Sequence, residues 1–142
     1  MEQAKNSILI VDDEKINLKV LTQILSQDYI VYTAKDGQTA IDMVMEYLPD
    51  LVLLDVIMGE MNGYKVAGKL KEVEKSHDIP IIFITGLSSI EDEEIGIALG
   101  GADYISKPFS PVMVKLRVRN QLQIVNQKRE IKRLQEQLKH SV

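Results

Sequence analysis

The 142-residue sequence predicts an α/β fold in which helices cover both faces of a doubly wound, five-stranded parallel sheet. Short apolar segments recur along the chain, and amphipathic segments separate them. This alternation is typical of repeated β-α-β units, which build parallel sheets. A long helical pattern near the C-terminus adds one further element. The apolar segments are residues 8–11, 30–33, 51–54 and 81–84, with a weaker one at Tyr104 and Ile105.

Amphipathic helices are predicted between these strands. The second is expected over residues 38–47, after the turn Lys35-Asp36-Gly37, and the third over residues 64–73. A fourth is expected over residues 89–99, because serines precede an acidic first turn and two glycines follow the last residue. The first helix carries apolar residues at helical spacing, namely Ile16, Val20, Leu21, Ile24 and Leu25.

The last helix is expected to start at Ser110 and Pro111, an N-cap followed by proline in the first turn, and to run to about Lys139. Its first half has one apolar stripe suited to packing on the sheet. Its second half alternates steps of three and four, as a coiled coil does, over about two heptads. We therefore divide the chain into a domain over residues 1–122 and a helical extension over residues 123–142. The extension is a candidate for a coiled-coil linker. The stripe is Val114, Val118, Leu122 and Val125, and the seam is Ile124, Gln127, Ile131, Leu134 and Leu138.

Composition limits the classes of function. The net charge of −4 and the sequence pI of about 5.2 argue against nucleic-acid binding by this chain. No apolar run is long enough for a bilayer, so no membrane contact is expected. The chain has no cysteine, and its N-terminus lacks the order of a secretory signal. A cytoplasmic location is the resulting expectation.

Polar side chains follow the predicted strands. Asp12 and Asp13 follow the first strand, Asp55 the third, Thr85 the fourth and Lys107 the fifth. The carboxyl ends of parallel strands share one edge of a sheet, so these side chains are expected to converge. Clustered carboxylates repel one another unless a cation lies among them, and Mg²⁺ prefers such oxygen ligands. The pattern predicts a metal-dependent phosphoryl site with Asp55 as the attacking group.

Each of these residues also has a plainer interpretation. Asp12 and Asp13 alone would serve as a helix N-cap, Thr85 as a strand-end hydroxyl bonded to backbone, and Lys107 as a solvated lysine. Their joint placement at the ends of four strands favours the phosphoryl site.

Four segments of the sequence, "ILIVDDE", "LVLLDVIMGEMNG", "IIFITG" and "GADYISKPF", closely resemble the motifs of the receiver domain of two-component response regulators. The resemblance covers roughly residues 6–122. It implies a flavodoxin-like sheet of strand order 2-1-3-4-5. It also implies Mg²⁺-dependent (or Mn²⁺-dependent) phosphotransfer from a sensor histidine kinase or a phosphotransfer protein. Such a domain modifies itself and slowly reverses the modification, but it is not a turnover enzyme.

The resemblance also implies a role for each matching residue. Asp55 would be the phospho-acceptor, and Lys107 would pair with the phosphoryl group. Lys107 would precede a cis peptide bond to proline. Thr85 and Tyr104 would form a switch pair, although Tyr104 alone is equally a packed aromatic. The metal ligands would be Asp13, Asp55 and the backbone carbonyl of Ile57, with Asp12 acting indirectly.

One position departs from the family pattern, because Gly59 stands where proline is usual. The C-terminal helix resembles the linker of receivers that precede HD-type phosphohydrolases or diguanylate cyclases. The chain is then either a portion of a longer protein or a stand-alone receiver, and the helix is either a signalling linker or a dimerisation arm. In both cases a homodimer through this helix is expected.

Three other classes of function fit the sequence less well. A docking module without phosphorylation would not need Asp12, Asp13, Asp55, Thr85 and Lys107 together. A hydrolase with a phospho-aspartate intermediate would need a cap domain, for which no segment is long enough. A flavin-binding domain would need a phosphate loop where this chain has acidic residues, which would repel the phosphate.

Overall fold

The sheet of the computed structural model has the expected order. The structure describes residues 5–59, 62–86, 98 and 101–141. Its strands are parallel and lie in the order β2-β1-β3-β4-β5. This confirms the flavodoxin-like fold with strand order 2-1-3-4-5. The strands are β1 (Ser7–Val11), β2 (Ile30–Ala34), β3 (Leu51–Asp55), β4 (Ile81–Thr85) and β5 (Gly101–Ser106).

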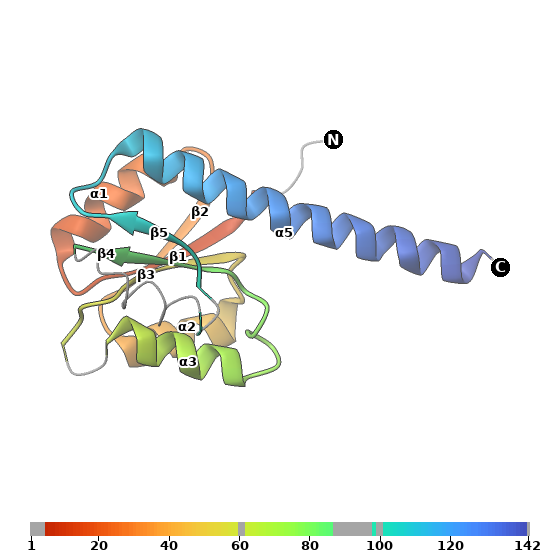
Figure 1. The fold of residues 1–142 in the computed structure, drawn as a ribbon, viewed down its shortest axis with the longest axis horizontal. Helices are drawn as coiled ribbons and strands as arrows, with labels where there is room; N and C mark the ends of the chain where they lie inside the picture. Colours follow the sequence, from red (N-terminus) through yellow and green to blue (C-terminus); the bar gives the residue numbers. More distant parts are fainter. Residues whose placement is uncertain (1–4, 60–61, 87–97, 99–100, 142) are drawn as a thin grey trace.

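The helices cover both faces of the sheet. Figure 1 shows α1 and α5 on one face and α2 and α3 on the other. The fourth predicted helix, over residues 89–99, falls almost wholly outside the described residues. The described helices are α1 (Lys15–Leu25), α2 (Gly37–Tyr47), α3 (Gly63–Glu72) and α5 (Pro111–His140).

Two apolar cores lie against the sheet, one on each face. Ile8, Ile10 and Leu53 pack with residues of α1 and α5 on one face, while Leu9 and Leu54 pack with residues of α2 and α3 on the other. Alternate residues of a strand point to opposite faces, so a strand covered on both faces is apolar throughout. This is why the central strands appear in the sequence as uninterrupted apolar runs.

The apolar face expected for the first helix is wrong at one position. Ile16 lies at helical spacing from Val20, but it is 67% exposed, and the buried face is formed by Leu18, Leu21 and Leu25. Successive residues of a helix are rotated by about 100°, so Ile16 lies about 200° from Leu18 and faces solvent. The buried residues of α1 follow one another at steps of three and four residues, and the first of them is Leu18.

Helix α5 begins as expected and extends far from the sheet. The Ser110 side chain accepts a hydrogen bond from the Met113 backbone N–H, and Pro111 occupies the first turn. Val114, Val118 and Leu122 are buried against the sheet. Figure 1 shows the C-terminal half of α5 continuing beyond the body of the domain. Across the described residues, no helix combines the length and apolar character needed to cross a membrane.

Candidate functional site

The strand order places the carboxylates where they can act together. Strand β1 has β2 on one side and β3 on the other. The sheet is therefore extended toward one edge from β1 to β2 and toward the opposite edge from β3 to β5, and this change of direction lies between β1 and β3. Asp12 directly follows β1, and Asp55 is the last residue of β3. Ligands of such sheets bind in the crevice outside the carboxyl ends of the strands, at this reversal. The two carboxylates therefore flank the position where a ligand is expected.

Three of the predicted residues form one acidic cluster. Carboxylate oxygens of Asp12, Asp13 and Asp55 all lie within 4.8 Å of one another. Asp12 and Asp55 are buried, whereas Asp13 is exposed. The interpretation of Asp12 and Asp13 as an N-cap is not what the structure shows, because the N-cap of α1 is Glu14. Asp12 Oδ1 instead accepts a hydrogen bond of 2.9 Å from the Glu14 backbone N–H.

Lys107 enters the cluster from the loop after β5. Its Nζ donates a hydrogen bond of 3.0 Å to Asp55 Oδ2 and lies 3.7 Å from Asp12 Oδ2. The Lys107 backbone N–H also donates to the Thr85 carbonyl at 3.0 Å, which fixes the loop against the end of β4. The peptide bond from Lys107 to Pro108 is cis, as expected. The interpretation of Lys107 as a freely solvated lysine is therefore wrong.

Burial and charge shift the protonation equilibria of the cluster. Burial raises the pKa of Asp12, and the charge of Asp55 adds to the rise, while the Glu14 N–H and the charge of Lys107 offset part of it. Burial alone lowers the pKa of Lys107. The hydrogen bond to Asp55 and the charges of Asp12 and Asp55 outweigh that effect, so the pKa of Lys107 is raised. The site thus favours a charged lysine and disfavours a charge on Asp12.

The remaining predicted residues lie around the cluster. Thr85 ends β4 and is buried, with 6% of its surface exposed. Tyr104 lies in β5 and is half-buried, and its ring packs against Phe83 with centroids 5.7 Å apart. Ile57 donates its backbone N–H to Asp55 Oδ1 at 3.1 Å. The Ile57 side chain is 58% exposed beside the cluster.

The loop after β3 depends on two glycines. A Cβ atom on Gly63 would lie 2.2 Å from the carbonyl oxygen of Asp55, so only glycine lets α3 begin so close to the end of β3. The sequence signal for this close approach is the position of Gly63 directly after Asn62, the N-cap of α3. Gly59 has a φ of +24°, which the ring of proline cannot adopt. The glycine in place of the usual family proline therefore matches the backbone found here.

The cluster fits a hard divalent cation. Asp12 Oδ2 is buried and accepts no hydrogen bond from any described residue. One ammonium faces three carboxylates, which leaves an excess of negative charge. Mg²⁺ takes one or two carboxylates with waters and phosphate oxygens, a donor set that these residues supply. The side chains present at this edge of the sheet are thus suited to Mg²⁺ or Mn²⁺.

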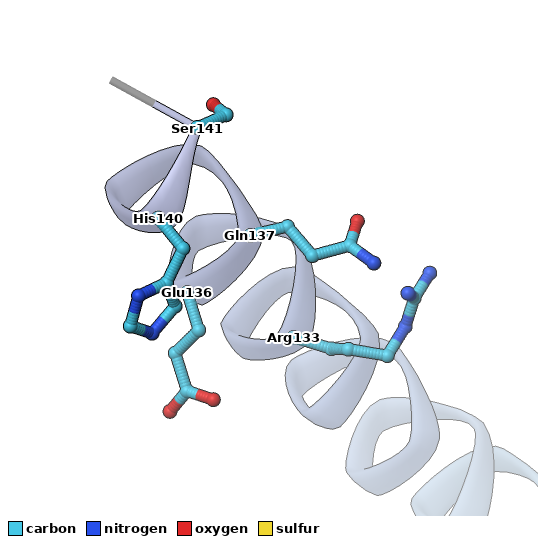
Figure 2. Close-up of a pocket in the computed structure, with 5 residues that line it drawn as sticks. All are labelled: Arg133, Glu136, Gln137, His140 and Ser141. Carbon is cyan, nitrogen blue, oxygen red and sulfur yellow. The ribbon is translucent and has the colours of Figure 1, made fainter.

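A shallow hollow lies on the last turns of α5 and is a poor candidate for a ligand site. Figure 2 shows that its side chains all project from one helix. Each of them is exposed, and no second element encloses the space. The lining residues are Arg133, Glu136, Gln137, His140 and Ser141.

Residues 8–119 match the family model of the response regulator receiver domain. A Vibrio cholerae protein named "Probable cyclic di-GMP phosphodiesterase" is 44% identical over 117 residues, which are 82% of this chain and 26% of that protein. "Response regulator PleD" of Caulobacter vibrioides is 41% identical over 114 residues, which are 80% of this chain and 25% of that protein. The chain therefore spans about a quarter of each of these relatives.

Solved structures agree with the sequence comparisons. Chemotaxis protein CheY4 of Vibrio cholerae superimposes with a TM-score of 0.78 and 28% identity, over 86% of this chain and 99% of that one. The receiver domain of a signal transduction histidine kinase from Syntrophus aciditrophicus gives a TM-score of 0.76 and 32% identity, over 83% of this chain and 90% of that one. The family model, the relatives and the fold agree, and the chain belongs to the response regulator receiver domains of two-component systems.

Proposed function

We propose that this chain accepts a phosphoryl group on Asp55 in a Mg²⁺-dependent transfer from a sensor histidine kinase or a phosphotransfer protein. One observation carries the proposal. The Asp55 carboxylate lies within reach of two further carboxylates and hydrogen-bonds to the Lys107 ammonium at 3.0 Å. This arrangement supplies a nucleophile, a cation site and a fixed positive charge at one sheet edge.

The transfer follows from these positions. An Asp55 carboxylate oxygen attacks the phosphorus of a phosphohistidine, the new O–P bond forms, and the N–P bond breaks. The electron pair of the broken bond returns to the imidazole nitrogen of the donor. Lys107 stabilises negative charge on the phosphoryl oxygens, and the Ile57 N–H holds one Asp55 oxygen in place. The residues that would hold the metal are Asp13, Asp55 and the Ile57 carbonyl, with Asp12 acting indirectly.

When bound, Mg²⁺ supplies positive charge for the phosphoryl oxygens during this step. The chain's own residues then convert the modification into a signal. Thr85 ends β4 beside the cluster, so its hydroxyl is placed to hydrogen-bond a new phosphoryl group. The Tyr104 ring, packed on Phe83, moves into the space that Thr85 leaves. Phosphorylation in this way shifts the population between two packings of β4 and β5.

The C-terminal helix is the segment that would transmit the signal from the receiver domain. We propose that residues 123–142 form an extension of the receiver domain of residues 1–122, and that two copies pair through it as a coiled coil. Four apolar residues support this pairing, because Ile124, Ile131, Leu134 and Leu138 are 44%, 56%, 45% and 67% exposed. The paired helix would connect to an output domain or a downstream partner.

We also propose that the protein is located in the cytoplasm, and we assign no turnover activity to this chain.

Intact mass tests the phosphotransfer. Incubation of the wild type with acetyl phosphate and Mg²⁺ is expected to add one phosphoryl group, and Asp55→Asn or removal of Mg²⁺ with a chelator is expected to abolish it. A known receiver, treated in parallel, shows that the donor is competent. An unmodified wild type beside a modified control would contradict the proposal and favour a docking module that works without phosphorylation.

A further inference from the structure

A polar cluster joins α5 to the amino ends of β1 and β3. Asp50, directly before β3, has a side chain that is only 15% exposed. Its Oδ2 accepts a hydrogen bond of 2.8 Å from the Ser7 backbone N–H and one of 3.2 Å from the Asn6 amide. Its Oδ1 accepts a hydrogen bond of 2.6 Å from the Arg129 guanidinium. One carboxylate thus connects the start of two strands to the C-terminal helix.

The helix contributes a second contact to this cluster. The side-chain amides of Asn6 and Asn126 each donate to the other, with both hydrogen bonds at 3.1 Å. Asn126 and Arg129 are three residues apart, so they lie on the same face of α5. Two contacts, linked to each other by the hydrogen bond from Asn6 to Asp50, therefore hold this face of the helix against the body of the domain.

These contacts extend the docked part of α5 beyond its apolar packing. Leu122 is the last buried residue of the helix, and Arg129 follows it by about two turns. Beyond Arg129, every described residue of α5 is exposed. Side-chain contacts between α5 and the body of the domain therefore continue beyond Leu122 to Arg129.

We propose that Asn6, Asp50, Asn126 and Arg129 form a polar clamp that fixes α5 to the sheet and sets the direction in which residues 130–140 leave the domain. The clamp lies at the amino ends of the strands, away from Asp55. A separate ion pair, Arg117 with Asp103 at 3.1 Å, ties the first half of α5 to β5. The helix is thus attached at two places, one on the edge strand β5 and one on the central strands.

A solvent-exposed ion pair alone would not hold a helix, because water and salt screen its charges and two long side chains must be ordered to form it. Here the carboxylate is largely shielded, and backbone and amide donors already orient it. The guanidinium therefore meets a fixed acceptor rather than a mobile side chain. The amide pair of Asn6 and Asn126 adds a contact that does not depend on charge or on salt.

Spin-label distances test the clamp directly. The chain has no cysteine, so Glu46→Cys on α2 and Gln135→Cys on α5, both at exposed positions, give two unique labelling sites. The labelled protein is diluted with unlabelled protein so that only distances within one chain are measured. We expect a narrow distance distribution in the wild type and a broad one in Arg129→Ala and in Asp50→Asn.

Arg133→Ala is the matched control, because Arg133 pairs with Glu130 on the same helix and not with the body of the domain. Figure 2 shows Arg133 projecting from the exposed part of α5. This variant is expected to keep the narrow distribution. A distribution in Arg129→Ala as narrow as in the wild type would overturn the proposal, and so would equal broadening in Arg133→Ala.

Hydrogen exchange gives a second readout that separates the clamp from general instability. In Arg129→Ala, amides of residues 123–130 are expected to exchange several-fold faster, while those of β1 and β3 keep the wild-type rate. Unchanged exchange over residues 123–130 would contradict the clamp. Both experiments use the unphosphorylated protein, so their outcome is independent of the phosphotransfer proposed for Asp55.

Discussion

The buried charge of Asp12 is unfavourable for the stability of the fold but suits the binding of a cation. The carboxylate is fully buried, and Asp12 Oδ2 has no hydrogen bond among the residues described, so its charge destabilises the cation-free protein. A divalent cation would reverse this effect, because it supplies the opposite charge at the position where the carboxylates converge. The residue is thus explained better by a metal site than by the stability of the fold.

Asp12→Asn is expected to raise the melting temperature of the cation-free protein and to weaken Mg²⁺ binding. The amide removes a buried charge that repels Asp55. Thermal unfolding in chelator and Mg²⁺ titration followed by tyrosine fluorescence measure the two effects. Asp13→Asn is the control, because Asp13 is exposed and its loss should weaken Mg²⁺ binding without raising the melting temperature. A melting temperature that falls in Asp12→Asn would contradict this account.

Gly63→Ala is expected to destabilise the protein by about 1–3 kcal/mol, because a Cβ there meets the backbone of Asp55. The displaced strand end should also slow phosphorylation of Asp55. Urea unfolding and the rate of mass increase with acetyl phosphate test the two effects. Gly86→Ala is the matched control, since a Cβ at Gly86 meets nothing within 4 Å. Equal effects of the two substitutions would show that the close approach at Gly63 is unimportant.

Helix α5 combines two kinds of surface within one element. Leu122 is 3% exposed and belongs to the core, whereas Leu138 is 67% exposed. Leu122→Ala is expected to lower the free energy of unfolding by about 2–5 kcal/mol, because it leaves a cavity in the core. Leu138→Ala should leave the unfolding of the domain unchanged. Urea denaturation of both variants at low protein concentration, where pairing is weak, measures the difference, and comparable losses would contradict it.

The hydrogen bond from Arg129 of α5 to Asp50, directly before β3, is expected to weaken at low pH. Burial raises the pKa of Asp50, but the Ser7 N–H and the hydrogen bonds from Arg129 and Asn6 outweigh it, so the pKa lies below its ordinary value of 3.8. A carboxyl group whose pKa is lower in the folded state stabilises the fold above its unfolded pKa. That contribution is lost as the pH falls through the folded pKa.

At neutral pH the free energy of unfolding is therefore expected to be larger for the wild type than for Asp50→Asn. This difference in free energy should disappear below about pH 4. Urea unfolding at a series of pH values measures this gap. Asp42→Asn, which removes an exposed carboxylate of α2, is the control and should follow the wild-type pH dependence. A gap between wild type and Asp50→Asn that stays constant down to low pH would contradict the lowered pKa of Asp50.

The elements differ in how well the sequence predicts them. Strands β1, β3 and β4 are covered on both faces, so their uninterrupted apolar runs predict them well, and these runs also locate Asp12, Asp55 and Thr85 at the strand ends. The sequence does not predict the exposure of Ile16 in α1, because an isoleucine near a helix end fits an apolar stripe whether or not it is buried. The Asp50 contacts were missed because they join residues 79 positions apart through polar side chains, which periodicity does not register.

At the scale of the whole molecule, the exposed apolar residues of α5 predict self-association. Sedimentation velocity is expected to show a dimer for the wild type and mainly monomer for the double variant Ile131→Ser, Leu138→Ser. Both positions are exposed, so the domain itself should remain folded. A wild type that sediments as a monomer at high concentration would remove the proposed pairing, although it would leave the phosphotransfer chemistry untouched.

The fold brings the carboxyl ends of β1, β4 and β5 beside Asp55 at the end of β3. We propose that Asp55 alone receives the phosphoryl group. Borohydride reduces an acyl phosphate of aspartate to homoserine, so the modified residue can be located by tandem mass spectrometry. After reaction with acetyl phosphate and Mg²⁺, we predict homoserine at position 55 and nowhere else. Homoserine at position 12 or 13, or none in a protein whose mass shows phosphorylation, would contradict this account.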